Sequence, residues 1–264
     1  MESLQKSSET EIPEYDEGAR KLLLLGYIAR IFTQIFPYVG GIGLVISSTG
    51  WLRHYSRVEK KLILLILVLA LMVSGLLHIY VDYTKSLLTY TVPSIAQEGE
   101  VKLSEIKELL ELTVAGMGTV LDIILYGLLA LTFTIEAFII KYVAMLYRKA
   151  FYSWLWIMFI LIGVLYFALI PTTINAANGI NEMINEINET LQVEGDRVLN
   201  ESEVISFIMG FTSFLFPVMA ISVVLFIVRL VTMILSALGF HKIPKVIERL
   251  KLFQELKRPV QQGS

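Results

Sequence analysis

Four ionisable residues lie inside long apolar stretches of this chain, where their chemistry would have the largest consequences. They are Arg30, Asp122, Glu136 and Arg229. An ionisable side chain in the hydrocarbon layer of a membrane is costly unless it is paired, hydrated or close to an interface. Each of the four therefore marks either a structural contact between helices or a functional site.

Glu136 and Arg229 have matching positions relative to two basic segments. Glu136 precedes Arg148 by 12 residues, and Arg229 precedes His241 by 12 residues. If the basic segments mark one membrane plane, both side chains lie at the same depth, and we predict an ion pair between them. The alternative is that both helices extend beyond the membrane and that the two side chains reach the interface by snorkelling.

Asp122 follows a stretch rich in small residues, A-G-M-G-T over 115–119, which would let another helix approach closely. It lies 14 residues before Glu136, nearly four helical turns, so both carboxylates face roughly the same way. This polar stripe could line an aqueous path, or it could form hydrogen bonds within a helix bundle. Arg30 has a similar choice between a buried partner and the outer interface, and we expect the interface if residues 22–36 form an apolar helix lying flat on the membrane.

No enzymatic motif is present. The three histidines are isolated from one another, and the chain lacks a zinc-protease motif, a Walker loop, a dinucleotide-binding glycine pattern and a nucleophile elbow. The chain has no cysteine, which excludes disulfides and thiolate metal sites. We therefore expect a protein that is not an enzyme and that holds no cofactor and no metal.

The charged residues are sorted by position along the chain. Segments 53–61, 141–149 and 241–264 hold 13 Lys/Arg against 3 Asp/Glu, whereas segments 1–21, 82–111 and 178–204 hold 7 Lys/Arg against 19 Asp/Glu. Lys and Arg are retained on the cytoplasmic side when a polytopic protein inserts. The pattern predicts a multi-pass protein of the cell membrane with its N-terminus outside and its C-terminus in the cytoplasm.

The apolar stretches between these segments predict an all-α, polytopic membrane helix bundle of about five transmembrane helices. Hydrophobic residues make up 55% of the chain and mean hydropathy is +0.68, which favours a membrane protein over a soluble domain. The transmembrane bundle is predicted over 22–240, with spans at about 22–52, 62–88, 113–147, 151–177 and 205–240. An acidic extracellular N-terminus, 1–21, precedes it. A basic amphipathic cytoplasmic tail, 241–264, follows it and is suited to lying on anionic lipid or docking a partner.

The first apolar stretch leaves two possibilities open, because it contains Pro37 and a glycine cluster at 40–43. It forms one span, or an interfacial helix followed by a span.

Two helical hairpins are predicted to extend outside the membrane. Apolar residues at helical spacing, Ile180, Met183 and Ile187, continue the fourth helix until the turn at Gly195. Asn200 with Glu203 three residues later predicts a capping box for the returning helix. The turn at Gly195 resembles the turn at 98–103 (E-G-D-R-V-L beside E-G-E-V-K-L), which suggests a duplicated hairpin and an acidic stalk of four helices.

Asn188 and Asn200 each begin a possible glycosylation sequon, and both lie in the segment predicted to be outside.

The join between the third and fourth predicted helices carries a family resemblance. It reads Y-R-K-A-F-Y-S-W-L over 147–155 and contains Arg148, Lys149, Phe151 and Trp154. The pattern Arg-x-x-Phe-x-x-Trp resembles the polytopic inner-membrane subunits of bacterial conjugation and type IV secretion machines. Their archaeal counterparts are the membrane channel proteins of the crenarchaeal DNA-import (Ced) system, and the absence of cysteine fits an archaeal version.

This resemblance implies a membrane channel component of a DNA-translocation apparatus that a separate cytoplasmic ATPase powers. The implied partners are the lipid bilayer, small membrane subunits, the ATPase and DNA, within a multi-subunit complex. Arg148, Lys149, Phe151 and Trp154 would then face the cytoplasmic partner or the DNA. The chain departs from the bacterial family by having short helical hairpins in place of a large central domain.

Two other functions stay open at this point. One is an ion or small-solute transporter that uses Asp122 and Glu136, and the other is a non-transporting membrane scaffold or sensor.

Overall fold

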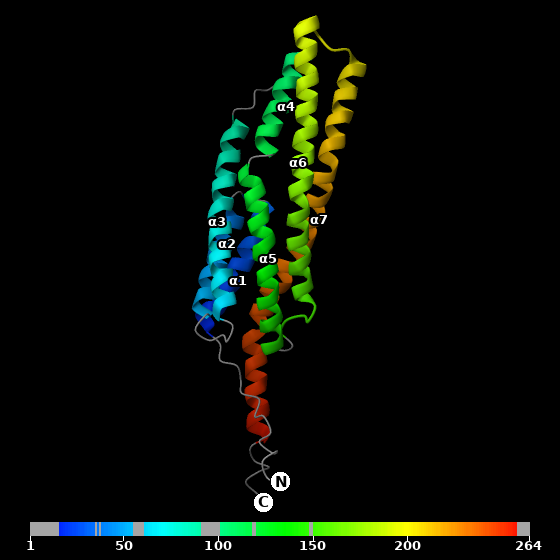
Figure 1. The fold of residues 1–264 in the computed structure, drawn as a ribbon. Coiled ribbons are helices and arrows are strands. Elements are labelled where there is room, and N and C mark those ends of the chain that lie inside the picture. The colour runs from blue at the N-terminus through cyan, green and yellow to red at the C-terminus, as the bar shows by residue number, and fades with distance from the viewer. Residues whose placement is uncertain are drawn as a thin grey trace, which may run out of the picture.

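The computed structural model describes residues 16–34, 36, 38–54, 61–90, 101–117, 120–147 and 150–257 of the 264-residue chain. These residues form α-helices, one short 3-10 helix and an isolated antiparallel bridge (Figure 1), which confirms the all-α prediction. The elements are α1 (Glu17–Ile31), η1 (Phe32–Gln34), α2 (Val39–His54), α3 (Lys61–Tyr90), α4 (Leu103–Met117), α5 (Val120–Leu146), α6 (Leu155–Glu194) and α7 (Glu201–Lys257).

Four helical stretches in the described part of the chain are long and apolar enough to cross a membrane. They are Leu62–Thr84 in α3, Leu103–Leu146 across α4 and α5, Leu155–Glu194 in α6, and Glu201–Phe253 in α7. A crossing needs ~20 mostly apolar residues, and the last four predicted spans correspond to these stretches. The chain is a multi-pass membrane protein.

The first apolar stretch is not one continuous helix, so the possibility of a single span across it is wrong. It forms α1 and α2, of 15 and 16 residues, so each helix is about 23 Å long, short of the ~30 Å hydrocarbon layer. The two helices are antiparallel, and Asp16 Oδ1 lies 3.1 Å from Arg53 Nε. Both ends of this re-entrant hairpin therefore lie beside the basic segment that begins at Arg53, at what we call the basic end of the bundle.

The start of α1 and the C-terminal part of α7 also lie at the same end of the bundle. The Arg20 guanidinium donates to the carbonyl of Phe240, at 3.4 Å, where α7 reaches the basic end. Asp16, Arg20, Arg53 and Phe240 thus share one end of the bundle, so the start of α1 and the C-terminal part of α7 cannot lie on opposite sides. The prediction of an N-terminus outside counted the first stretch as one crossing, and residues 1–15 themselves lie outside the described part of the chain.

Glycines let the hairpin close. A Cβ atom on Gly43 would lie 2.9 Å from the backbone nitrogen of Arg30, and one on Gly26 would lie 2.8 Å from that of Ser47. These are distances that a side chain cannot occupy, so the α1 and α2 backbones meet only where small residues allow it. The hairpin then packs through α2 on α3 and through α1 on α7.

A single apolar core joins the hairpin to α3, α5, α6 and α7. Its largest fully buried side chains include Tyr27, Trp51, Phe133 and Phe159, with Phe240 stacked on Tyr27 at a ring distance of 5.3 Å. A second apolar core lies beyond it, between α4 and the outer parts of α6 and α7, which rise above the other helices in Figure 1. Among the described residues the stalk core is built from three helices, α4, α6 and α7, and α3, the fourth helix predicted for the stalk, makes few contacts with α4.

The details predicted for the second hairpin are confirmed. Ile180, Met183 and Ile187 are buried in the stalk core. Asn200 Oδ1 accepts from the Glu203 backbone N–H at 3.0 Å, and Glu203 Oε2 accepts from the Asn200 N–H at 3.0 Å, which is the capping box.

The two segments of similar sequence lie beside each other at the stalk tip. Lys102 and Val198 form an antiparallel bridge, in which Leu103 N–H donates to the Arg197 carbonyl and Leu199 N–H donates to that of Val101. The Ser104 N–H and hydroxyl both donate to the Asp196 carboxylate, at 3.1 and 2.8 Å. The two similar segments thus contact each other and join the two hairpins. The predicted turn around Gly99 lies outside the described residues.

The stalk tip should loosen in acid. Two hydrogen bonds from the Arg197 guanidinium and one from the Asn200 N–H lower the pKa of Glu203 from 4.5 to about 2. A carboxyl with a lowered pKa in the folded state stabilises above its ordinary pKa and loses that contribution as pH falls through the folded value. We expect amide exchange at Leu103 and Leu199, corrected for its intrinsic pH dependence, to rise as pH falls from about 4.5 to about 2.

A Glu203→Gln variant should show a smaller pH-dependent step, because only the Asp196 carboxyl, whose pKa is lowered by its hydrogen bonds from Ser104, then contributes to it. A step of unchanged size in that variant would contradict the assignment to Glu203. The effect is small because the pair is solvent-exposed.

The predicted basic tail is a direct continuation of α7. The helix runs without interruption to Lys257 and projects from the basic end (Figure 1). Ile243 and Ile247 are buried against the bundle, whereas Leu250 and Phe253 are exposed. Its apolar face is thus partly covered by the protein itself.

Candidate functional site

Six polar residues from four parts of the chain meet in the middle of the bundle, and we call them the central polar cluster. They are Tyr27, Arg30, Thr33, Glu136, Tyr166 and Arg229. Glu136 lies 11 residues from Tyr147, and Arg229 lies 11 residues from Phe240, so both lie about 17 Å from the basic end. That depth is the middle of a ~30 Å hydrocarbon layer.

Arg30 and Glu136 form a two-pronged ion pair. Arg30 Nη1 donates to Glu136 Oε1 and Arg30 Nη2 donates to Oε2, both at 2.8 Å, and neither side chain is exposed. The Tyr27 hydroxyl donates to Oε1 at 2.5 Å. Charge-assisted pairs of this geometry are the strongest hydrogen bonds that side chains make. The pair fastens the re-entrant hairpin to α5.

Arg229 is bound by hydroxyl groups. Its Nη1 donates to the Tyr166 hydroxyl at 2.7 Å and its Nη2 donates to Thr33 Oγ1 at 2.9 Å. The Thr33 hydroxyl in turn donates a hydrogen bond to the Arg30 carbonyl, at 2.7 Å. The ring of Phe133 lies close to both guanidinium groups, 4.9 Å from Arg30 Cζ and 5.9 Å from Arg229 Cζ, which adds a cation–π attraction.

These contacts correct two predictions. Glu136 and Arg229 do reach the same depth, but Glu136 pairs with Arg30, because the hairpin brings α1 between α5 and α7. Arg30 is buried in this pair and does not lie at the outer interface.

Asp122 is not part of the cluster. It is buried near the outer end of α5, and its 14-residue separation from Glu136 amounts to about 21 Å along the helix. Between the two carboxylates, the same face of α5 packs on its neighbours, and Thr132 shares a hydrogen bond with Ser74 of α3 at 3.0 Å. The stripe on α5 therefore serves contacts between helices.

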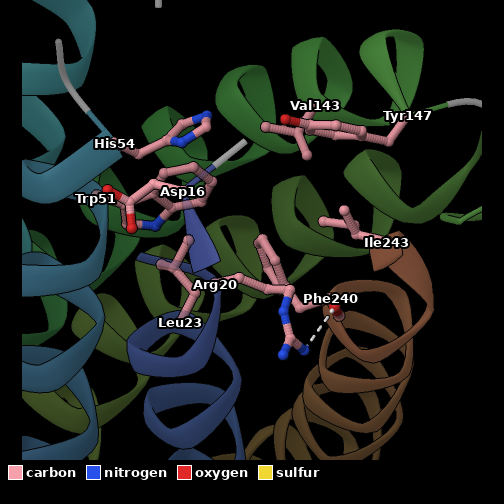
Figure 2. Close-up of a pocket in the computed structure, with 9 residues that line it drawn as sticks. All are labelled: Asp16, Arg20, Leu23, Trp51, His54, Val143, Tyr147, Phe240 and Ile243. Carbon is pink, nitrogen blue, oxygen red and sulfur yellow. Dashed lines mark hydrogen bonds between the residues drawn. The ribbon is translucent and has the colours of Figure 1, made fainter. Parts of the chain in front are cut away.

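A small pocket lies at the basic end, where the start of α1 meets α2, α5 and α7 (Figure 2). Asp16, Arg20 and His54 are its polar lining residues, and Leu23, Trp51, Val143, Tyr147, Phe240 and Ile243 complete it. Its cavity volume of about 20 Å³ has room for about one water molecule. The start of α1 thus fills the basic end of the bundle.

The join between α5 and α6 was expected to face a cytoplasmic partner or DNA, and only part of it is placed to do so. Phe151 is buried, with its ring edge against Phe240 at 5.0 Å, so it fastens the join to α7 and does not face a partner or DNA. Trp154 is exposed at the basic end. Arg148 and Lys149 lie outside the described residues. Asn188 and Asn200 lie on the stalk, away from the basic end.

Tyr27, Thr33 and Tyr166 were missed from sequence. Tyr27 and Thr33 each lie three residues from Arg30, a spacing that puts all three on one side of a helix and could have indicated a polar face. Tyr166 has no comparable signal.

Asp82 accepts from the Tyr38 N–H at 2.9 Å and so holds the turn of the hairpin to α3.

No family model, curated protein or solved structure matches this chain.

Proposed function

We propose that the chain is a membrane channel component of a DNA-translocation apparatus in the cell membrane, powered by a separate cytoplasmic ATPase. In this proposal the basic end faces the cytoplasm, as the retention of Lys and Arg on that side favours, and the stalk faces outside. The chain works as a subunit without catalytic chemistry or a cofactor of its own.

The observation that carries the proposal is the re-entrant hairpin held by the Arg30–Glu136 pair. A chain that turns back within the membrane is tolerated only where protein buries it or where it lines a water-filled path. Such broken elements at mid-membrane are typical of proteins that move polar cargo. A purely anchoring bundle has no need of one.

DNA is favoured as the cargo by the resemblance at the join and by the charge of the basic end. Described cations there include Arg53, Lys141, Lys242, Lys245 and Arg249, and clustered cations attract phosphate backbones. The acidic stalk repels DNA, so its role in the proposal is to hold small membrane subunits. Because the cavity at the basic end admits about one water molecule, the conducting path lies between this chain and other subunits.

The geometry gives less support to ion transport by Asp122 and Glu136. Both oxygens of Glu136 already accept hydrogen bonds from Arg30, and one accepts a further bond from Tyr27. Asp122 lies about 21 Å away along α5. A relay between these carboxylates would need the ion pair to break and water to enter.

The test is a deletion of the gene in its host, with DNA uptake and DNA export measured separately. We expect transfer in one direction to be lost, to return with the wild-type gene, and not to return with Glu136→Ala. A Lys21→Ala gene, which changes an exposed residue of α1, should restore transfer. Unchanged transfer in the deletion strain would contradict the proposal and leave the scaffold or sensor and the ion or small-solute transporter as the functions to test.

A further inference from the structure

The outer part of α7 extends beyond the membrane. A Cβ atom on Gly179 of α6 would touch the Phe214 ring, so these two residues lie at one level. Gly179 is 24 residues beyond Leu155, where α6 begins, which is about 36 Å of helix and exceeds the ~30 Å hydrocarbon layer. At this level α6 exposes Glu182, Asn185 and Glu186, as a helix in water does.

At the same level α7 exposes large apolar side chains. Ile205, Met209 and Phe216 are 49%, 68% and 67% exposed, and α7 carries no ionisable residue from 204 to 228. The opposite face, which includes Phe207, Phe211 and Phe214, already packs in the stalk core. A contiguous apolar face exposed to water is a sign of an interaction surface.

Within the exposed face, which also includes Ile208, one row of residues has the spacing of a coiled coil. Ile205, Met209, Thr212, Phe216, Met219 and Val223 follow one another at alternating steps of four and three residues, and all are exposed. We call them the α7 seam. An average period of 3.5 residues keeps one stripe facing a neighbouring helix that runs alongside, so the shape of the seam is suited to a helix.

We propose that the α7 seam binds the same seam of a second copy of this chain, in a parallel pair related by a two-fold axis along the membrane normal. Copies inserted in the same direction present their α7 helices parallel and in register. Identical faces without charge meet with no like-charge repulsion, as an isologous contact requires. The seam runs on into the membrane through Met219 and Val223, so one continuous contact joins the stalks and the spans.

The exposed serines next to the seam support this pairing. Ser206 and Ser213 lie one residue after Ile205 and Thr212 and are exposed. Small side chains between large ones leave the holes into which the knobs of a partner helix fit. Lipid could cover Met219 and Val223, but it cannot reach Ile205 and Met209.

Cysteine cross-linking tests the proposal directly because the chain has no cysteine of its own. Single variants Met209→Cys and Phe216→Cys are oxidised in native membranes. Val193→Cys, which places a thiol at an 86% exposed position of the α6 stalk, is oxidised in parallel as the control. We expect a disulfide-linked band at twice the 29.9 kDa mass of the chain. Its yield should be several-fold higher for the two seam variants, and a scan over 205–217 should peak at the seam positions.

A charge placed in the seam gives the second arm. Met209→Glu in the Phe216→Cys background should abolish the cross-link, whereas Val193→Glu in that background should leave it intact. Equal yields at seam and control positions, cross-linking that survives Met209→Glu, or linkage to a different polypeptide would each overturn the proposal.

Discussion

Replacing either Arg30 or Glu136 with alanine should destabilise the folded bundle by about 3–5 kcal/mol, because each change leaves one uncompensated charge buried among apolar side chains. The remaining charge would have lost its counter-charge, and water could not solvate it because neither side chain has any exposed surface. The effect is measured as the shift of thermal unfolding in detergent micelles, followed by the fluorescence of the buried Trp51.

The double variant separates the cost of an orphaned charge from the value of the pair. Arg30→Met combined with Glu136→Leu removes both charges and keeps much of the volume, and such replacements of buried pairs are often close to neutral. We expect the double variant to unfold nearer to the wild-type temperature than either single variant. Single variants that unfold at the wild-type temperature would show that Arg30 and Glu136 do not pair in the folded protein.

Gly43→Val should open the re-entrant hairpin. The new Cβ would lie 2.9 Å from the Arg30 nitrogen and 3.0 Å from the Gly26 carbonyl oxygen, both backbone atoms of α1. Overpacking of a core costs about 1–3 kcal/mol, and here the cost should be greater because separating α1 from α2 also moves Arg30 away from Glu136. We expect a lower unfolding temperature and a lower yield of folded protein in the membrane.

Gly127→Val is the matched control for this change. Gly127 also lies in a membrane helix, α5, but a Cβ there meets only Ile170 Cδ1, at 4.0 Å. It should leave unfolding nearly unchanged. If both valine variants behave alike, the close approach of α1 and α2 is not what holds the hairpin.

The long apolar helices were predictable because a membrane span is specified by local composition. The extensions of α6 and α7 were predictable for a similar reason: Ile180, Met183 and Ile187 recur at helical spacing, and Asn200 and Glu203 form a local cap. Each of these features depends on residues close together in the chain. Their structure follows from periodicity and capping alone.

The hairpin and the partner of Glu136 depend on contacts between distant segments. Residues 22–52 are apolar enough and long enough to be counted as a crossing, and only the close approach of Gly26 and Gly43 to the facing backbone turns the chain back. Once α1 enters the bundle from the basic end, Arg30 competes with Arg229 for Glu136, and it pairs through both guanidinium nitrogens. Equal spacing from basic segments could predict the depth of Glu136 and Arg229 but not this choice.

A hairpin in place of a first span puts the start of α1 at the basic end of the bundle, on the same side as the C-terminal part of α7. This placement is tested most directly by labelling single cysteines in intact and permeabilised cells with a membrane-impermeant maleimide. Suitable positions are the exposed Lys21 in α1, His241 at the basic end and Val193 on the stalk. We predict that Lys21→Cys and His241→Cys react only after permeabilisation and that Val193→Cys reacts in intact cells. Reaction of Lys21→Cys on the same side as Val193→Cys would contradict the hairpin.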